Sequence, residues 1–288
     1  MSARRFAGVF GWPLDHTLSP EIHNAAFRAA GLDWVYLPFP VPPEGLADAV
    51  RGLRALGAAG ANVTMPHKET IIELLDEVSE DAQTLGAVNT VERVGDRLVG
   101  HNTDVAGFAA VLTEDAGYSP AGRRAVVLGA GGAARAVVKA LDELGAAEIS
   151  VVARDPRRAE AVAGVASAAV ARVVAWERAA DECSAADCVV NATPLGMYDG
   201  DMSREETERT DPSGGAAFRP GQFVCDLIYQ PPTTALLERA RTAGADAWGG
   251  LGMLVHQAAA AFAIWTGREA PIEAMSAAAV RAVGSTRR

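Results

Sequence analysis

A glycine-rich segment in the middle of the chain constrains the fold more than any other feature of the sequence. Residues 125–138 read AVVLGAGGAARAVV, which is an apolar run, a G-x-G-x-x-A loop and a second apolar run with helical spacing. In a dinucleotide-binding βαβ unit, the first glycine permits a tight turn and the second lets backbone amides approach a pyrophosphate. The small third residue allows the helix to pack on the strand. The segment therefore predicts a strand, a phosphate-binding loop and a helix.

Strand and helix patterns alternate on both sides of this loop, which is typical of an α/β fold. In the first part of the chain, the expected strands are residues 6–10, 34–38, 61–64, 88–93 and 97–101, and the expected helices are residues 19–31, 43–56, 69–75 and 104–116. In the second part, the expected strands are residues 125–128, 149–153, 170–175, 188–191 and 223–228, and the expected helices are residues 133–144, 156–165 and 233–243. A last long helix is expected from about Leu251. The sequence therefore predicts two α/β domains, connected by the segment YSPAGRR.

Composition excludes several classes of partner. The chain has 288 residues, and its formal net charge of -10 disfavours nucleic acid and anionic membranes. The three cysteines form no CxxC pair and have no nearby histidine at metal-ligand spacing, so we expect free thiols in a reducing cytosol and no metal. The most apolar late segment, residues 258–265, is too short to span a bilayer. We expect a soluble cytoplasmic protein that acts on a small molecule.

The residues after the expected strand 149–153 indicate which dinucleotide is bound. An NAD enzyme tends to place an acidic residue there, whereas an NADP enzyme places an arginine for the 2′-phosphate. Arg154 stands where a guanidinium can form a fork with the phosphate or stack on the adenine, and Arg158 can add a second contact. A solvated basic turn is the alternative interpretation, and Asp155 is a discordant charge. The sequence favours NADP.

Polar side chains in the first part of the chain follow the expected strand ends, where ligands bind in open α/β sheets. Thr17 and Ser19 lie at a helix N-terminus, which suits an anion such as a carboxylate, and Pro20 suits the first helical position. The segment ANVTMPHK supplies Asn62 and Thr64, around the end of the expected strand 61–64. The alternative for Ser19 and Thr64 is that each only caps a helix.

Three further residues are candidates for the same site. Lys68 is expected in the first turn of a helix that continues through residues 69–75. A cation there opposes the helix macrodipole, so its position suggests another purpose. The segment GAVNT supplies Asn89, and the segment GHNTDVAGF, after the expected strand 97–101, supplies Asp104. The alternatives are that Asn89 satisfies a local backbone turn and that Asp104 caps the helix 104–116.

Seven motifs, spread over nearly the whole chain, resemble those of the shikimate dehydrogenase family in the family's order. They are GWPLDHTLSPEIHN (11–24), ANVTMPHK (61–68), GAVNT (86–90), GHNTDVAGF (100–108), NATPLGM (191–197), DLIYQPPTT (226–234) and GLGMLVHQ (250–257). The resemblance implies a substrate-binding domain of residues 1–104, completed by residues 251–288. It also implies a Rossmann-type NADP-binding domain of residues 105–250, with a cleft between the two α/β domains.

The resemblance implies reversible, NADPH-dependent reduction of 3-dehydroshikimate to shikimate in aromatic amino-acid biosynthesis, with Lys68 and Asp104 as catalytic residues. The residues that it implies around the substrate are Thr17 and Ser19 on the carboxylate, and Asn62, Thr64, Lys68, Asn89, Asp104 and Gln257 around the ring, with Tyr229 nearby. The residues that it implies along the cofactor are Gly129, Ala130, Gly131, Gly132, Ala133, Ala134, Arg154, Arg158, Leu227 and Gly250. Gln257 shares an apolar helical stripe, so its amide needs either a ligand or a protein partner.

Two departures from the family pattern leave alternatives open. Thr17 stands where a serine is more usual, which narrows the carboxylate pocket and leaves the choice between shikimate and quinate open. Ala153 and Asp155 replace the usual Asn and Thr around Arg154, which leaves strict NADP use open. The alternatives are a quinate/shikimate or aminoshikimate dehydrogenase and a non-catalytic NADP(H)-binding sensor. The protein is expected to be a monomer or a homodimer, and residues 199–220 are expected to form a flexible loop with no recognisable chemistry.

Overall fold

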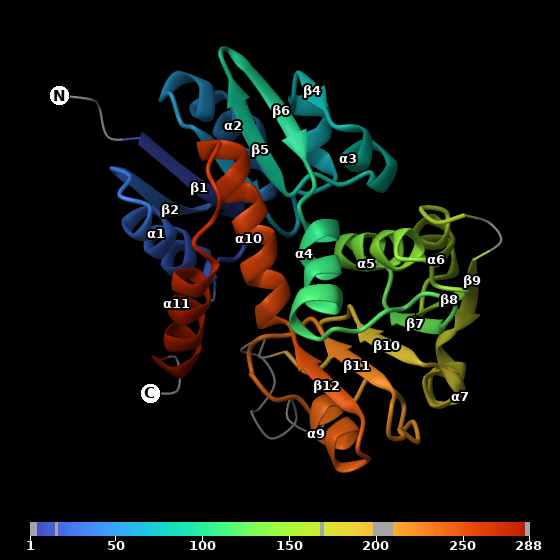
Figure 1. Ribbon diagram of the computed structural model, residues 1–288. Helices are drawn as coiled ribbons and strands as arrows, with labels where there is room; N and C mark the ends of the chain where they lie inside the picture. The colour runs from blue at the N-terminus through green and yellow to red at the C-terminus, as the bar shows by residue number, and fades with distance from the viewer. Residues whose placement is uncertain (1–4, 15–16, 168–169, 198–209, 286–288) are drawn as a thin grey trace. The chain divides into compact units, whose positions relative to one another are not determined.

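The computed structural model describes residues 5–14, 17–167, 170–197 and 210–285 (Figure 1). The chain divides into two compact units, Met1–Gly107 with Leu254–Arg288 as unit 1 and Phe108–Met253 as unit 2. The predicted α/β class with two α/β domains is confirmed. Within the described ranges, no helix combines the length and the apolar character needed to cross a membrane.

Unit 1 contains a six-stranded mixed sheet in the order β2-β1-β3-β5-β6-β4. Its strands are β1 (Arg5–Gly11), β2 (Trp34–Pro40), β3 (Gly60–Val63), β4 (Glu77–Val78), β5 (Thr90–Val94) and β6 (Arg97–His101). Strands β2, β1 and β3 are parallel, whereas β5 pairs antiparallel with both β3 and β6. Crossovers between the parallel strands bring the ends of β1 and β3 to the same edge of the sheet, which is where the predicted polar residues follow them.

The helices of unit 1 come from both ends of the chain. They are α1 (Ser19–Ala29), α2 (Leu46–Ala55), α3 (Glu80–Leu85), the start of α4 (Asp104–Ala110), most of α10 (Leu251–Thr266) and α11 (Ile272–Ser285). Helix α1 packs against α11 and β2. Trp265 of α10 donates a hydrogen bond from Nε1 to the carbonyl of Val91, at 3.0 Å. A Cβ at Gly60 would lie 2.3 Å from Trp265 Nε1, so the glycine permits this close approach.

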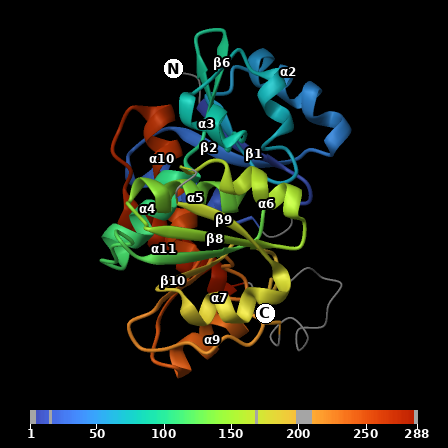
Figure 2. The ribbon, with the colours of Figure 1, turned by 90° about the vertical axis from the view of Figure 1, so that its right-hand side faces the viewer.

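Unit 2 contains a six-stranded parallel sheet in the order β12-β11-β10-β7-β8-β9, which is the strand order of a dinucleotide-binding fold. Its strands are β7 (Arg124–Leu128), β8 (Glu148–Ala153), β9 (Ala171–Ala175), β10 (Cys188–Asn191), β11 (Phe223–Asp226) and β12 (Asp246–Gly249). The helices are α5 (Gly132–Glu143), α6 (Pro156–Ala163), α7 (Ala179–Ala185) and α9 (Ala235–Thr242). Helices α5 and α6 cover one face of the sheet and α7 and α9 the other (Figure 1, Figure 2).

Several element boundaries differ from the sequence-based expectations. The expected helix 43–56 is divided into a 3₁₀ helix, η1 (Pro43–Gly45), and α2. The expected helix 104–116 changes after α4 to a π helix, η3 (Val111–Asp115). Residues 199–209 of the expected loop 199–220 lie outside the described residues, and residues 210–220 form neither helix nor strand.

Candidate active site

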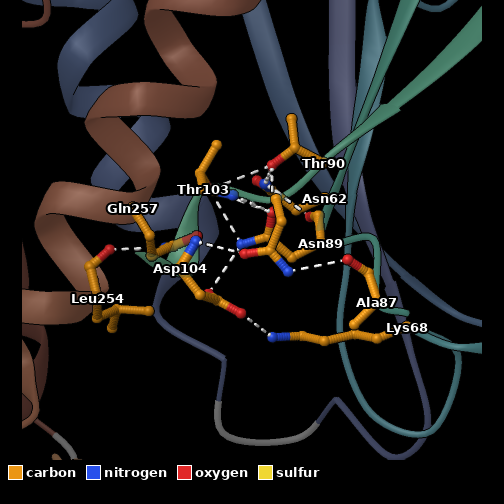
Figure 3. A network of polar contacts seen from close by, with 10 residues as sticks. Asn62, Lys68, Ala87, Asn89, Thr90, Thr103, Asp104, Leu254 and Gln257 are labelled. Atoms are coloured by element: carbon orange, nitrogen blue, oxygen red, sulfur yellow. Dashed lines mark hydrogen bonds and ion pairs between the residues drawn. The ribbon is translucent and has the colours of Figure 1, made fainter. Parts of the chain in front are cut away.

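The centre of the candidate site in unit 1 is an ion pair between Lys68 and Asp104. Lys68 lies in the turn after β3, and Asp104 is the first residue of α4. The two side chains meet at 2.5 Å between Nζ and Oδ2, and their exposed fractions are 22% and 8% (Figure 3). Because a partly desolvated ammonium is attracted more strongly to a carboxylate than a solvated one, this arrangement keeps a cation at a fixed position.

Asn89 fixes the other side of the Asp104 carboxylate. Its Nδ2 donates to Asp104 Oδ1 at 2.8 Å and to Thr103 Oγ1 at 3.0 Å. Its Oδ1 accepts a hydrogen bond from the backbone N–H of Thr103 at 2.8 Å. Asn89 therefore joins two segments that are far apart in sequence, rather than satisfying a local backbone turn, and it orients the acid that pairs with Lys68. Figure 3 shows these contacts together.

Asn62 is bound on both sides by protein groups. Its Oδ1 accepts a hydrogen bond from the Tyr36 hydroxyl at 2.7 Å. Its Nδ2 donates to the carbonyl of Asn89 at 3.2 Å and to Thr90 Oγ1 at 3.0 Å. Both N–H groups of the Asn62 amide therefore have protein acceptors, so the geometry favours support of Asn89 over donation to a ligand.

A buried aromatic cluster lies behind Asn62. The imidazole of His23 stacks on the ring of Tyr36 with centroids 4.3 Å apart, and Trp265 lies 5.2 Å from His23. Burial lowers the pKa of His23 to about 3, so the imidazole is neutral at physiological pH. Burial raises the pKa of Tyr36, so its hydroxyl keeps the proton that it donates to Asn62. Sequence reasoning missed Tyr36, although a tyrosine inside the apolar strand WVYLPFP signals a buried hydroxyl that needs a partner.

The structure corrects the argument that singled out Lys68. The expected helix 69–75, directly after this residue, is a five-residue 3₁₀ helix, η2 (Thr70–Leu74), and not an α-helix. The macrodipole argument for Lys68 is therefore wrong. Its observed partner, the Asp104 carboxylate, explains the position of the cation instead.

The two residues expected near a carboxylate lie at the start of α1. Ser19 is the first residue of this helix, and Leu18 occupies the N-cap position. The interpretation of Ser19 as a helix cap is therefore wrong, because the N-cap position belongs to Leu18, which has no polar side-chain atom. The backbone N–H of Ser19 donates to Thr17 Oγ1 at 3.4 Å, so the two residues form one turn. His16 of the same motif lies outside the described residues.

Gln257 lies next to α4, close to Asp104 in the fold. A Cβ at Gly107 would lie 2.9 Å from the Cβ of Gln257, so only a glycine lets α4 and α10 approach this closely. The amide Nε2 of Gln257 donates to the carbonyl of Leu254, at 2.7 Å, within its own helix (Figure 3). The sequence left two alternatives for this amide, a ligand or a protein partner. The structure shows a protein partner for its nitrogen. Thr64 lies directly after β3.

The glycine-rich loop of unit 2 has the geometry that a pyrophosphate needs. Gly129 has a φ of +112°, and a Cβ there would lie 2.9 Å from the carbonyl oxygen of Ala192, so another residue would be strained. Gly131 is the N-cap of α5 and gives no side-chain hydrogen bond to the helix. A Cβ at Gly131 would meet no atom within 4 Å, so open space lies beside the first amides of α5. These residues fit a dinucleotide phosphate.

The turn after β8 presents Arg154, Asp155 and Arg158. Asp155 is the N-cap of α6, and its Oδ1 accepts hydrogen bonds from the backbone N–H groups of Arg157 at 3.0 Å and Arg158 at 3.3 Å. The guanidinium carbon of Arg154 lies 5.2 Å from the centroid of the Trp176 ring. Asp155, which the sequence places as a discordant charge beside the expected phosphate, therefore has a structural role at the start of α6.

A buried acid orders the segment that contains Leu227 and Tyr229. Asp226, at the end of β11, accepts hydrogen bonds from Thr234 Oγ1 at 2.6 Å and from Asn191 Nδ2 at 2.9 Å. Gly250 contacts the same segment, since a Cβ there would lie 2.0 Å from the carbonyl oxygen of Leu227. The motifs NATPLGM and DLIYQPPTT are thus joined through their first residues.

Replacing Asp226 with asparagine is expected to change how stability depends on pH. Burial raises the pKa of Asp226 from 3.8 to about 6, although its hydrogen bonds oppose this shift. The folded state therefore binds this proton more tightly than the unfolded chain, and the resulting stabilisation is lost as the pH rises from about 4 through about 6. Asparagine does not ionise. Relative to the wild type, the free energy of unfolding of Asp226→Asn should rise by roughly 1–3 kcal/mol between pH 4 and pH 7. Urea unfolding at both pH values measures this difference, and an equal offset at both would contradict it.

Comparisons with known proteins cover nearly the whole chain. Residues 9–91 match the family described as shikimate dehydrogenase substrate binding domain, residues 112–198 match shikimate / quinate 5-dehydrogenase, and residues 250–280 match the shikimate 5'-dehydrogenase C-terminal domain. A shikimate dehydrogenase (NADP(+)) from Moorella thermoacetica is 47% identical over 96% of this chain and 93% of the relative.

Solved structures agree with these matches. A shikimate 5-dehydrogenase from Thermus thermophilus, in complex with NADP(H) and shikimate, is 37% identical, with a TM-score of 0.82 over 96% of this chain and 99% of that chain. A quinate dehydrogenase from Corynebacterium glutamicum, in complex with NAD, is 34% identical, with a TM-score of 0.84 over 96% of this chain and 99% of that chain. With these relatives and with the motifs of both units in place, the chain belongs to the shikimate dehydrogenase family.

Proposed function

We propose that this protein catalyses the reversible, NADP-dependent interconversion of 3-dehydroshikimate and shikimate, a step of aromatic amino-acid biosynthesis. The observation that carries the proposal is the Lys68–Asp104 pair, with 2.5 Å between Nζ and Oδ2 and with Asn89 bound to the other carboxylate oxygen. A cofactor-binding protein without catalysis would need no such fixed cation. The relative from Moorella thermoacetica has this NADP-dependent activity in its name.

The chemistry of ketone reduction explains these residue types. When bound, NADPH supplies a hydride to the carbonyl carbon. Negative charge then develops on the carbonyl oxygen, and a cation with a transferable proton stabilises it. Lys68 provides both the charge and the proton, while Asp104 keeps the ammonium in place and accepts a hydrogen bond from a neighbouring ring hydroxyl. Because Asn89 and Asp104 hold the ammonium in position through protein contacts, little reorganisation is needed during the reaction.

The remaining predicted residues would bind the substrate away from the reacting carbon. Thr17 and Ser19, at the start of α1, would bind its carboxylate through their hydroxyl groups. Thr64 and Gln257, with Tyr229 of the motif DLIYQPPTT, would contact the ring. Asn62 and Asn89 have most of their hydrogen-bonding groups occupied by protein, so their main contribution is to hold Asp104 in position.

The cofactor would bind along the carboxyl ends of the strands of unit 2. The amides at the start of α5 suit its pyrophosphate, and Arg154 suits its 2′-phosphate. The residues proposed to bind it are Gly129, Ala130, Gly131, Gly132, Ala133, Ala134, Arg154, Arg158, Leu227 and Gly250.

The test of this proposal is an absorbance assay for reduced nicotinamide with four combinations of substrate and cofactor. Shikimate and quinate are each supplied with NADP and with NAD, and the highest kcat/KM is expected for shikimate with NADP. A second candidate is quinate oxidation, because Thr17 leaves the choice between the two acids open and a quinate dehydrogenase is among the similar structures. Preference for quinate would replace the first proposal with the second. Cofactor binding without turnover of either acid would support a sensor and contradict both.

We also propose that the enzyme acts in the cytoplasm as a monomer or a homodimer. The three cysteines, Cys183, Cys188 and Cys225, are free and buried, which suits a reducing compartment. Light scattering on the purified protein measures the oligomeric state.

Replacing Arg154 with alanine is expected to weaken NADP binding and to leave NAD use nearly unchanged. A charge-assisted hydrogen bond to the 2′-phosphate contributes about 1.5–3 kcal/mol, and this contribution is absent for NAD. The KM for NADP should therefore rise by about 10- to 100-fold. Initial rates at varied concentrations of each cofactor measure the effect. Arg123→Ala is the control, since Arg123 also lies over an aromatic ring, that of Tyr118. Equal losses with both cofactors would show that Arg154 binds the adenine instead.

A further inference from the structure

Arg154 and Trp176 lie side by side because of the register between β8 and β9. These strands are parallel neighbours, and their last residues, Ala153 and Ala175, are paired. Arg154 directly follows Ala153, and Trp176 directly follows Ala175. The guanidinium carbon lies 5.2 Å from the centroid of the indole ring, within the range of a cation–π contact.

The indole ring is the fixed partner of this contact. Trp176 is partly buried and packs against the core cluster of unit 2, which includes Val174 and Ala179. Arg154, by contrast, is exposed. A long exposed arginine has many rotamers, and a planar ring beneath the guanidinium reduces their number before any ligand binds. The ring therefore directs the cation without itself needing to touch a ligand.

The carboxylate of Asp155, the residue next to Arg154, is bound to the backbone of α6 in the observed geometry. Asp155 accepts hydrogen bonds from the backbone N–H groups of Arg157 and Arg158, at the start of α6. Its carboxylate thus has partners on the helix, and the Arg154 guanidinium lies over the indole ring. Arg154 and Asp155 are adjacent in sequence, but their charged groups contact different partners.

We propose that Trp176 strengthens dinucleotide specificity by holding Arg154 where a ribose 2′-phosphate binds. Trp176 is a positioning residue that acts through Arg154, and it favours a 2′-phosphorylated nucleotide over its unphosphorylated counterpart. The inference rests on the proposed NADP function and deepens it, because it assigns cofactor choice to a residue outside the turn that binds the phosphate.

Calorimetric titration of the full chain with two nucleotides tests this role without any turnover. Adenosine 2′,5′-bisphosphate carries the 2′-phosphate, and adenosine 5′-monophosphate does not. Trp176→Leu is expected to weaken binding of the bisphosphate by about two- to fivefold and to leave binding of the monophosphate unchanged. Trp176→Phe keeps a ring beneath the guanidinium and should restore most of the affinity. Trp176→Met, whose unbranched and flexible side chain fills irregular gaps in a core, replaces the leucine variant if that variant does not fold.

A double-mutant cycle separates action through Arg154 from a general structural effect. In an Arg154→Ala background, Trp176→Leu should cause no further loss of bisphosphate affinity. In an Arg123→Ala background, the full two- to fivefold loss should remain, since Arg123 stacks on Tyr118 and not on Trp176.

Three outcomes would overturn the inference. They are equal weakening of both nucleotides by Trp176→Leu, a further loss in the Arg154→Ala background, and wild-type bisphosphate affinity in Trp176→Leu. The proposed function is judged separately. Wild-type protein that does not distinguish the two nucleotides would contradict NADP use itself, whereas normal discrimination without an effect of Trp176 would remove only the inference.

Discussion

Replacing Lys68 with methionine is expected to lower kcat by about 100- to 1,000-fold, because the alkoxide that develops during hydride transfer loses its stabilising cation. Methionine preserves the length of the side chain but has neither charge nor proton. Cofactor affinity should remain at the wild-type value, since the residues proposed to bind NADP lie in unit 2. Steady-state rates in the direction of shikimate oxidation, together with calorimetric titration of NADP, measure the two quantities.

The chain offers a matched control for this variant. Lys139, the other lysine, forms an ion pair with Glu143 on α5, at 3.1 Å. Lys139→Met removes the same chemical group from a helix surface and should leave kcat unchanged. A Lys68→Met enzyme with near-normal kcat would show that the cation has no part in the reaction and would refute the proposed mechanism.

Replacing Asp104 with asparagine is expected to lower kcat by about 100-fold. Asparagine keeps an oxygen for the Nδ2 of Asn89, but it presents no charged oxygen to Lys68. The ammonium then loses the group that fixes its position, and misplacement of a catalytic group is costly. Asp76→Asn is the control, because Asp76 also pairs with a cation of unit 1, Arg54, at 2.7 Å. That variant should retain wild-type kcat.

The double variant Lys68→Met/Asp104→Asn tests whether the two residues act as a unit. If they do, the double variant should be about as slow as Lys68→Met alone. Asp104 then acts only through the Lys68 ammonium, which the first substitution has already removed. Multiplied losses would instead mean that Asp104 contributes independently, for example through the substrate hydroxyl. Circular dichroism of each variant checks that the fold is intact.

Unit 2 was predicted from sequence more completely than unit 1, for a physical reason. Parallel strands that are covered on both faces read as continuous apolar runs, as VVL of β7 and CVVN of β10 do. The elements that were missed are short. For example, β4 of unit 1 has only the two residues Glu77–Val78 and becomes a strand through its pairing with β6. Such elements depend on tertiary neighbours, which local pattern does not contain.

In the candidate site, too, some residues could be predicted from the sequence, whereas others depend on tertiary structure. Lys68, Asn89 and Asp104 could be selected from sequence because each belongs to a polar segment next to an expected strand. The support from Tyr36 could not, because its bond to Asn62 depends on the strand order β2-β1-β3. The helix expected at residues 69–75 failed because the chain turns after one 3₁₀ segment and continues into β4.

The chain order of unit 1 has a consequence for synthesis on the ribosome. This unit starts with β1, yet α1 packs against α11, and Phe27 of α1 lies 5.7 Å from Phe262 of α10, between ring centroids. While the polypeptide is growing, the segment Phe108–Met253 emerges complete, and the earlier segment still lacks both late helices. Because domains generally fold as units, the part made first must wait with Phe27 uncovered. The nascent chain therefore needs protection from aggregation over its beginning until its last helices have left the exit tunnel.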